Sequence, residues 1–259
     1  MLLAVDIGNT NVVVGVFAGK KLLATWRLAT NMERMPDEWG VLLKNMLSHK
    51  GIDPLKVNQS VISSTVPPMS GVFDTVCREY FKSKPVIIGA GVKTGVKLLI
   101  DNPREVGPDR VADAAAAYNL YGGPVIIVDF GTATTVNAVS KAGEFLGGAI
   151  APGIWIAMEA LFSRTSMLQR VDLVKPKTAI GKNTVSSMQS GLIYGYIGMV
   201  EGLILRIQQE IGEKAKVVAT GGSANLIAPE TKLIDTVNPD LTLVGLQIIH
   251  DLNESPKND

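Results

Sequence analysis

Two copies of one strand–turn–strand pattern, each with an Asp-x-Gly turn, limit the folds open to this chain. The first copy follows an apolar run and has Asp6 and Gly8 in its turn, and the second has Asp129 and Gly131 at matching offsets. A further glycine turn and a third apolar run follow each copy, as in a set of antiparallel strands. Self-similarity on this scale indicates that a domain was duplicated and fused.

The periodicity of apolar residues predicts a β-sheet with covering helices in each half. In the first half, strands are expected at 2–5, 11–17, 21–28, 61–63 and 85–88, and helices at 36–49, 69–81 and 106–121. In the second half, strands are expected at 125–128, 134–139, 145–150 and 217–219, and helices at 152–163 and 184–211. We therefore predict an α/β protein with domains 1–116 and 117–259, a hinge near 115–120 and a frayed tail from Ser255.

Composition excludes several classes of function. The chain has 259 residues, of which 46% are apolar and 19% charged, so it belongs among compact globular proteins. Its formal net charge of +1 is spread without a long basic run, which argues against nucleic acid as a partner. Asp6 comes too early for a signal peptide, and we expect no apolar run long enough to cross a membrane. A cytoplasmic protein with a small ligand is the expectation.

The first turn, Asp6–Asn11, suits a polyphosphate. A carboxylate at the end of a buried strand is costly unless it is paired or bound to a metal. Gly8 lets the backbone approach a ligand closely, and the residues after it add neutral hydrogen-bond donors. Phosphate oxygens and a hydrated Mg²⁺ held by Asp6 fit these groups. An ordinary β-hairpin with an Asx-type turn favours the same residues, so this turn alone leaves both interpretations open.

Two further segments favour the phosphate interpretation. Asp129–Thr135 adds a second carboxylate, a second glycine and three hydroxyls. Two such turns facing each other across an interdomain cleft would hold the phosphates of one nucleotide, and such clefts are preferred ligand sites. Ala219–Ala224 places two glycines between a strand and a helix, where adenine or ribose can approach, although such glycines also form plain tight turns. Together the three segments favour an ATP-using kinase for a small molecule.

Five motifs carry a resemblance to a known family over nearly the whole chain, from Leu2 to about Leu252. They are, in order, Asp6–Asn11, Gly107–Arg110, Asp129–Thr132, Gly147–Gly153 and Ile180–Thr184. In this order they resemble type III pantothenate kinase, a family of the actin-like ATPase and sugar-kinase superfamily. The resemblance implies duplicated ribonuclease H-like domains, each a mixed five-stranded sheet with flanking helices, and a nucleotide in the interdomain cleft. It also implies phosphorylation of pantothenate at the start of coenzyme A biosynthesis.

The resemblance assigns roles to matching positions. Asp109 corresponds to the catalytic base, and Asp129 corresponds to a ligand of a monovalent cation, K⁺ or NH₄⁺. Asp6 would hold Mg²⁺ through water. The residues expected to bind pantothenate are Gly107, Pro108, Asp109, Arg110 and Thr184. The residues expected to bind ATP are Asp6, Ile7, Gly8, Asn9, Thr10, Asn11, Val12, Val13 and Thr132.

Two positions depart from the family pattern. Many members have Ala where this chain has Pro108, which stiffens the loop but leaves Asp109 and Arg110 in place. Many also have an aromatic substrate contact where Ile100 stands, so Ile100 is not assigned to the site. Without the other motifs, Asp109 would be read as a helix N-cap and Arg110 as a surface residue.

Two alternative functions remain open, and a homodimer is expected. A kinase for another small alcohol or sugar would share the superfamily motifs. A kinase-derived regulator would lose Asp109 or the turn aspartates and would carry a basic patch. The family is homodimeric, and the apolar stripe of the helix at 184–211, together with Trp155, is expected to form core or a homodimer interface.

Overall fold

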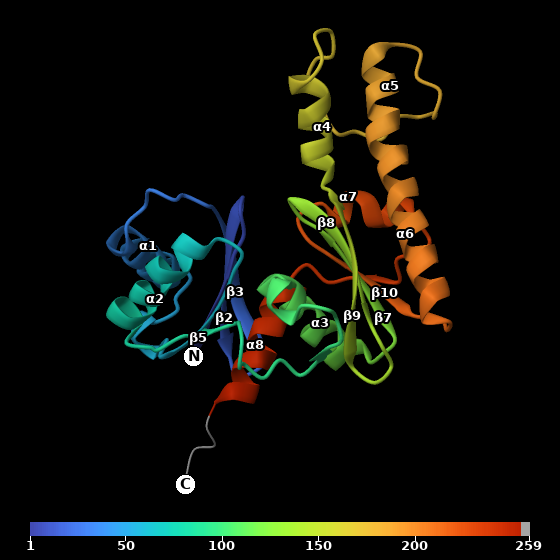
Figure 1. Ribbon diagram of the computed structural model, residues 1–259. Coiled ribbons are helices and arrows are strands. Elements are labelled where there is room, and N and C mark those ends of the chain that lie inside the picture. The colour runs from blue at the N-terminus through green and yellow to red at the C-terminus, as the bar shows by residue number, and fades with distance from the viewer. Residues whose placement is uncertain (255–259) are drawn as a thin grey trace. The chain divides into compact units, whose positions relative to one another are not determined.

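The computed structural model describes residues 1–254, which form two compact units, each built on one mixed β-sheet (Figure 1). Unit 1 contains Met1–Lys97, Asp101–Asn119 and the chain from Asp240 onward, and unit 2 contains Leu98–Ile100 and Leu120–Pro239. The predicted α/β class with two sheets is confirmed. The tail from Ser255, expected to fray, lies outside the described residues.

The sheet of unit 1 has the strand order β3-β2-β1-β4-β5. Its strands are β1 (Leu2–Ile7), β2 (Asn11–Ala18), β3 (Lys21–Ala29), β4 (Gln59–Ser64) and β5 (Val86–Ile87). The first three strands are antiparallel neighbours, whereas β4 pairs with β1 in parallel and β5 with β4 in parallel. Such parallel steps need a crossover, which the helices between these strands supply.

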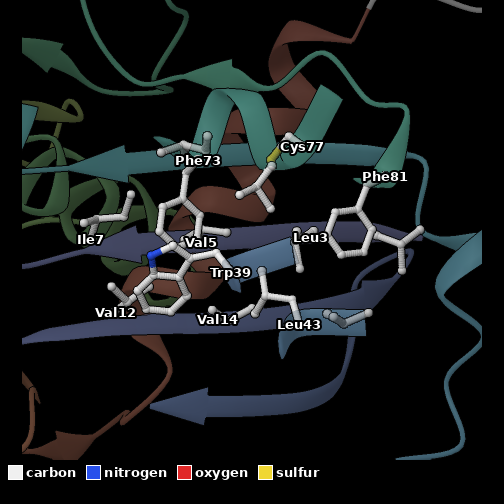
Figure 2. Close-up of a cluster of buried hydrophobic side chains, with 14 of the residues drawn as sticks. Leu3, Val5, Ile7, Val12, Val14, Trp39, Leu43, Phe73, Cys77 and Phe81 are labelled. Atoms are coloured by element: carbon white, nitrogen blue, oxygen red, sulfur yellow. The ribbon is translucent and has the colours of Figure 1, made fainter. Parts of the chain in front are cut away.

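Helices α1 (Pro36–His49) and α2 (Pro67–Phe81) supply the apolar side chains that pack on one face of this sheet. Both begin with proline at the first helical position, where the missing N–H is not needed. Figure 2 shows their packing: Trp39 and Phe73 meet with ring centroids 5.0 Å apart beside the strand residues. Cys77 lies in the same cluster, and burial raises the pKa of its thiol to about 11, so it is a core residue rather than a nucleophile.

Helix α8 (Leu241–Asn253) packs against β1, β4 and β2 and therefore belongs to unit 1. Helix α3 (Pro108–Tyr121) packs against α8, with Thr242 Oγ1 donating to Asp113 Oδ1 at 2.7 Å. The compact units thus do not coincide with the expected domains 1–116 and 117–259. The division falls between residues 119 and 120, within α3, and the chain returns to unit 1 with its last helix.

A glycine-to-alanine change tests the α3–α8 crossing. A Cβ on Gly245 would lie 1.9 Å from the backbone oxygen of Ala112, which can move only with α3. We expect Gly245→Ala to lower the unfolding free energy by about 1–3 kcal/mol, the usual effect of overpacking, and the melting temperature by several degrees. Gly198→Ala on α6 (Tyr196–Ile211) is the control, because its Cβ meets nothing within 4 Å and alanine is the better helix former. Equal melting temperatures of the two variants in scanning calorimetry would contradict the close crossing.

Unit 2 repeats the strand arrangement of unit 1 and adds one strand. Its order is β11-β10-β7-β8-β9-β6. The strands are β6 (Lys97–Leu98), β7 (Val125–Phe130), β8 (Ala133–Val139), β9 (Glu144–Pro152), β10 (Lys216–Thr220) and β11 (Thr236–Val237). Strands β9-β8-β7-β10-β11 match β3-β2-β1-β4-β5 in order and direction, which fits duplication. The sheet has six strands rather than the predicted five because β6 pairs at the edge beside β9.

The longest helical stretch, Thr184–Ile211, consists of α5 (Thr184–Ser190), a π-helical turn η3 (Gly191–Gly195) and α6 (Tyr196–Ile211). By length and composition it could cross a membrane, contrary to the expectation that no apolar run is long enough. However, Ile193, Ile197 and Val200 pack in the core cluster of unit 2. The predicted apolar stripe is therefore largely core.

The remaining helices are short. Helix α4 (Ile154–Ser163) follows β9 and lies beside α5, with Met158 and Met188 in one small apolar cluster (Figure 1). Helix α7 (Ala224–Ile227) follows β10. Single 3₁₀ turns are η1 (Pro54–Lys56), η2 (Pro103–Glu105) and η4 (Ala228–Glu230).

Candidate functional site

In unit 1, the first Asp-x-Gly turn is held by backbone and threonine hydrogen bonds. The Gly8 N–H donates to the Asn11 carbonyl at 2.9 Å, and the Gly8 carbonyl accepts from Thr30 Oγ1 at 2.6 Å. The Ile7 carbonyl accepts from both the N–H and the hydroxyl of Thr65, at 2.9 and 3.2 Å. The turn is therefore fixed before any ligand arrives. Sequence reasoning missed Thr30 and Thr65, although Thr65 stands where β4 ends.

Burial divides the predicted ATP-binding stretch into two groups. Asn9 and Thr10 are exposed, and Asp6 is half-buried at the end of β1. The side chains of Ile7 and Val12 lie in the core cluster, so these residues can offer a ligand only their backbone. Asn9 and Thr10 thus reach solvent, one oxygen of the Asp6 carboxylate is buried, and the apolar side chains anchor the hairpin.

Asp109 and Arg110 lie in the first turn of α3, also in unit 1. Pro108 starts the helix, and Asp109 Oδ1 accepts from the Arg110 N–H at 2.9 Å. A Cβ on Gly107 would lie 2.3 Å from Asp109 Oδ1, so this position requires glycine for the carboxylate to fold back over it. The residues of the predicted Gly107–Arg110 loop thus lie close together at the N-terminal end of α3.

Opposing effects act on the two charged groups of this loop. Burial raises the pKa of the Asp109 carboxyl above its ordinary value, and the Arg110 N–H and guanidinium counteract part of that rise. Burial lowers the pKa of Arg110, and the charge of Asp109 counteracts it. A carboxylate with a raised pKa is a better proton acceptor than a solvated one, which suits a general base.

In unit 2, three predicted motifs meet at the second Asp-x-Gly turn. A Cβ on Gly221 would lie 2.2 Å from Asp129 Oδ1, and Gly221 has a φ of +92° that favours glycine. Gly153, the last residue of the Gly147–Gly153 motif, donates its N–H to the Thr132 carbonyl at 3.2 Å. A Cβ on Gly153 would lie 2.3 Å from that same oxygen. The glycines are thus required by contact with the turn.

The three hydroxyls of the second turn have different environments. Thr132 is exposed, as a nucleotide contact must be. Thr134 and Thr135 are buried, the first hydrogen-bonded to the Tyr196 hydroxyl and the second accepting from Asn137 Nδ2 at 2.9 Å. Only Thr132 remains a direct ligand candidate, and Tyr196 is a residue that sequence reasoning missed.

Thr184 is exposed at the first position of α5, within a tightly capped helix start. Asn183 Oδ1 accepts from the Ser186 N–H at 2.9 Å, and Ser186 Oγ accepts from the N–H groups of Lys182 and Asn183. A Cβ on Gly181 would overlap the backbone of Ser187. The Ile180–Thr184 motif therefore builds a capping box that presents the Thr184 hydroxyl.

The residues present are compatible with hard cations. Within residues 1–254, no cluster of three or more His, Cys, Asp or Glu side chains forms a ready-made metal centre. Asp129 sits in a cradle formed by Gly131 and Gly221, where any Cβ would crowd its carboxylate. Oxygen donors of this kind suit K⁺ and Mg²⁺, with phosphate oxygens or water completing the shell.

Comparisons with known proteins place these motifs in a family. Residues 2–206 match the family model described as type III pantothenate kinase. A type III pantothenate kinase from Myxococcus xanthus is 53% identical over 255 residues, covering 98% of this chain and all of the relative.

Two solved structures show the fold. One, from a Campylobacter jejuni protein assigned to the Baf family of transcriptional activators, is 18% identical with a TM-score of 0.63 and covers 97% of this chain and 98% of its own. The other is a ROK hexokinase from Thermus thermophilus, 12% identical with a TM-score of 0.50, covering 96% of this chain and 97% of its own. At these identities the likeness concerns the fold alone.

Proposed function

Because this chain belongs to the type III pantothenate kinase family, we propose that it transfers the γ-phosphoryl group of ATP to pantothenate, making 4′-phosphopantothenate. This is the first step of coenzyme A biosynthesis. The observation that carries the proposal is 53% identity along the full length of a relative with that name, together with an intact Asp109, Asp6 and Asp129. We further propose a cytoplasmic location, with no nucleic acid or membrane as partner.

Unit 1 supplies the base and part of the phosphate site in this proposal. Asp109 accepts the proton of the pantothenate hydroxyl as the new O–P bond forms, and its burial supports that role. Arg110, half-buried beside it, offers a planar donor fork to the pantothenate carboxylate. Gly107 and Pro108 shape the loop.

The Asp6–Val13 hairpin binds the ATP phosphates in this proposal. The backbone of the turn and the exposed Asn9 and Thr10 side chains donate to the phosphate oxygens. Asp6 would hold Mg²⁺ through water, and such an ion would supply positive charge to neutralise the phosphates. The threonine bonds to the turn carbonyls keep these donors in place without reorganisation.

Unit 2 supplies a monovalent-cation ligand, Asp129, an ATP contact, Thr132, and a pantothenate contact, Thr184. We expect Asp129→Asn to weaken the activation by K⁺ or NH₄⁺, since a neutral amide binds a cation less strongly than a carboxylate. The measurement is initial rate against KCl concentration at constant ionic strength. An unchanged K⁺ response would remove Asp129 from this role.

The direct test is product formation. Purified protein with ATP, Mg²⁺ and K⁺ should convert pantothenate to 4′-phosphopantothenate, detected by mass spectrometry, with Asp109→Asn as the background control. A panel of hexoses and N-acetylhexosamines tests the sugar-kinase alternative. Phosphorylation of a sugar in preference to pantothenate would favour that alternative, and no turnover on any substrate would favour the regulator.

We also propose a homodimer. Helix α4 exposes Trp155, Ile156 and Phe162 at 52%, 45% and 43%, and Val185 on α5 is 51% exposed. Apolar side chains concentrated on neighbouring helices mark a protein interface more often than scattered ones do. Light scattering that gives the mass of a single 27.6 kDa chain would reject the dimer.

A further inference from the structure

Tyr196 joins three elements around the second Asp-x-Gly turn. Its ring packs against Phe130, with centroids 6.1 Å apart and planes tilted by 47°. Its hydroxyl is hydrogen-bonded to Thr134 Oγ1, and the backbone N–H of Ile154 lies close enough to act on the pKa of the phenol. The side chain is buried, with 6% of its surface exposed. The hydroxyl therefore ties α6 to the start of β8 and lies near the start of α4.

These partners enclose the turn in sequence and in space. Phe130 lies within the turn, and Thr134 follows Thr132 by two residues. Ile154 is the first residue of α4, and Gly153 before it donates to the Thr132 carbonyl at 3.2 Å. The Thr132 position is thus held from two sides by elements that Tyr196 connects.

The hydroxyl is available as a neutral group. Burial raises the pKa of Tyr196 above its ordinary value, and the hydrogen bond with Thr134 counteracts only part of that rise. At neutral pH the phenol therefore keeps its proton and shares a hydrogen bond with Thr134.

The local chain conformation also singles out this residue. Tyr196 follows directly after the π-helical turn Gly191–Gly195, an irregularity that is common at functional sites. Cβ atoms on Gly191 and Gly195 would meet nothing within 4 Å, so packing does not require these glycines. They lower the helix propensity where the chain adopts the wider turn.

We propose that Tyr196 is a positioning residue for phosphoryl transfer, which sets the place of Asp129 and Thr132 through its hydroxyl. The inference rests on the proposed function of this turn. It predicts that removal of the Tyr196 hydroxyl oxygen changes nucleotide and cation binding as well as stability.

The test compares Tyr196→Phe with Tyr194→Phe. The second variant also loses one hydroxyl bond, from Tyr194 to the Pro176 carbonyl at 2.7 Å, but away from the turn. We expect Tyr196→Phe to lower kcat about tenfold, to raise the KCl concentration for half-maximal rate, and to leave the KM for pantothenate within twofold. Tyr194→Phe should match the wild type in all three quantities. Calorimetric titration of the full protein with Mg-ATP, without pantothenate, gives a readout that does not need turnover.

Variants of Thr134 complete the test. Thr134→Val should reproduce the kinetic change of Tyr196→Phe, and Thr134→Ser, which keeps the hydroxyl, should restore wild-type values. If Tyr196→Phe does not fold, the valine and serine pair decides alone. Wild-type KCl response and ATP affinity in Tyr196→Phe or Thr134→Val would overturn the proposal. A wild-type protein that binds ATP but does not phosphorylate pantothenate would instead contradict the proposed function, and the ATP titrations would still test Tyr196.

Discussion

Replacing Asp109 with Asn is expected to lower kcat by about 10²- to 10⁴-fold, the usual contribution of a general base. Asn keeps the shape and still accepts the Arg110 N–H through its oxygen, so α3 should begin as before. ATP affinity, measured by calorimetric titration, should stay near the wild-type value. Full activity of Asp109→Asn would remove Asp109 from the role of base.

The pH dependence gives an independent check on Asp109. Only the ionised carboxylate accepts a proton, so kcat should fall as pH decreases through the raised folded-state pKa, above the ordinary carboxyl range near about 4. A raised folded-state pKa also means that the folded protein binds this proton more tightly than the unfolded chain. The contribution of Asp109 to stability is therefore full below the unfolded-state pKa and is lost as pH rises through the folded-state pKa.

The raised pKa of Asp109 also predicts the stability of the neutral variant Asp109→Asn. At pH 7, Asp109→Asn removes a charge that burial disfavours, so its melting temperature should equal or exceed that of the wild type. The combination of a large loss of kcat with no loss of stability separates a catalytic carboxylate from a helix cap. A cap residue would show the reverse, a lower melting temperature with little change in rate.

Gly221→Ala is expected to damage both stability and catalysis. Its φ of +92° costs a residue with a side chain about 1–2 kcal/mol, and its Cβ would lie 2.2 Å from Asp129 Oδ1 and 2.6 Å from the Phe130 nitrogen. The carboxylate must move, and a displacement of about 1 Å at a reacting centre can cost about 10²-fold in rate. We expect kcat/KM for ATP to fall by that order.

Gly212→Ala separates strain from contact. Gly212 has a φ of +76° at the end of α6, and a Cβ there meets nothing within 4 Å. This variant should lose about 1 kcal/mol of unfolding free energy and keep its activity. If Gly221→Ala resembled Gly212→Ala in both rate and stability, the contact between Gly221 and Asp129 would have no role in catalysis.

The sequence predicted well what is local. Alternating apolar residues and glycine turns identified β1 to β3 and β7 to β9 within a few residues, because these strands pair with their neighbours in the chain. Strands β6 and β11, with two residues each, carry no periodicity and were missed. The place of helix α8 in unit 1 could not be predicted either, because an amphipathic face does not specify which sheet it covers.

The candidate site was likewise predictable only in its local features. The aspartates were found because a charge at the end of an apolar strand stands out in the sequence. The contacts that hold them, such as Gly221 against Asp129 or Thr30 against Gly8, join residues far apart in the chain and leave no local pattern. Tyr196 looked like one more apolar helix residue, since only the tertiary structure shows that its hydroxyl reaches Thr134.

The return of α8 to unit 1 has a consequence for synthesis on the ribosome. Residues 1–119 emerge first, but the sheet face that α8 covers stays open until residues 241–253 have been made. The strands of unit 2 all precede α8 and can pair earlier. Open apolar sheet surface during this interval favours aggregation and chaperone binding. The half of the protein that is translated first is therefore the half whose folding is completed last.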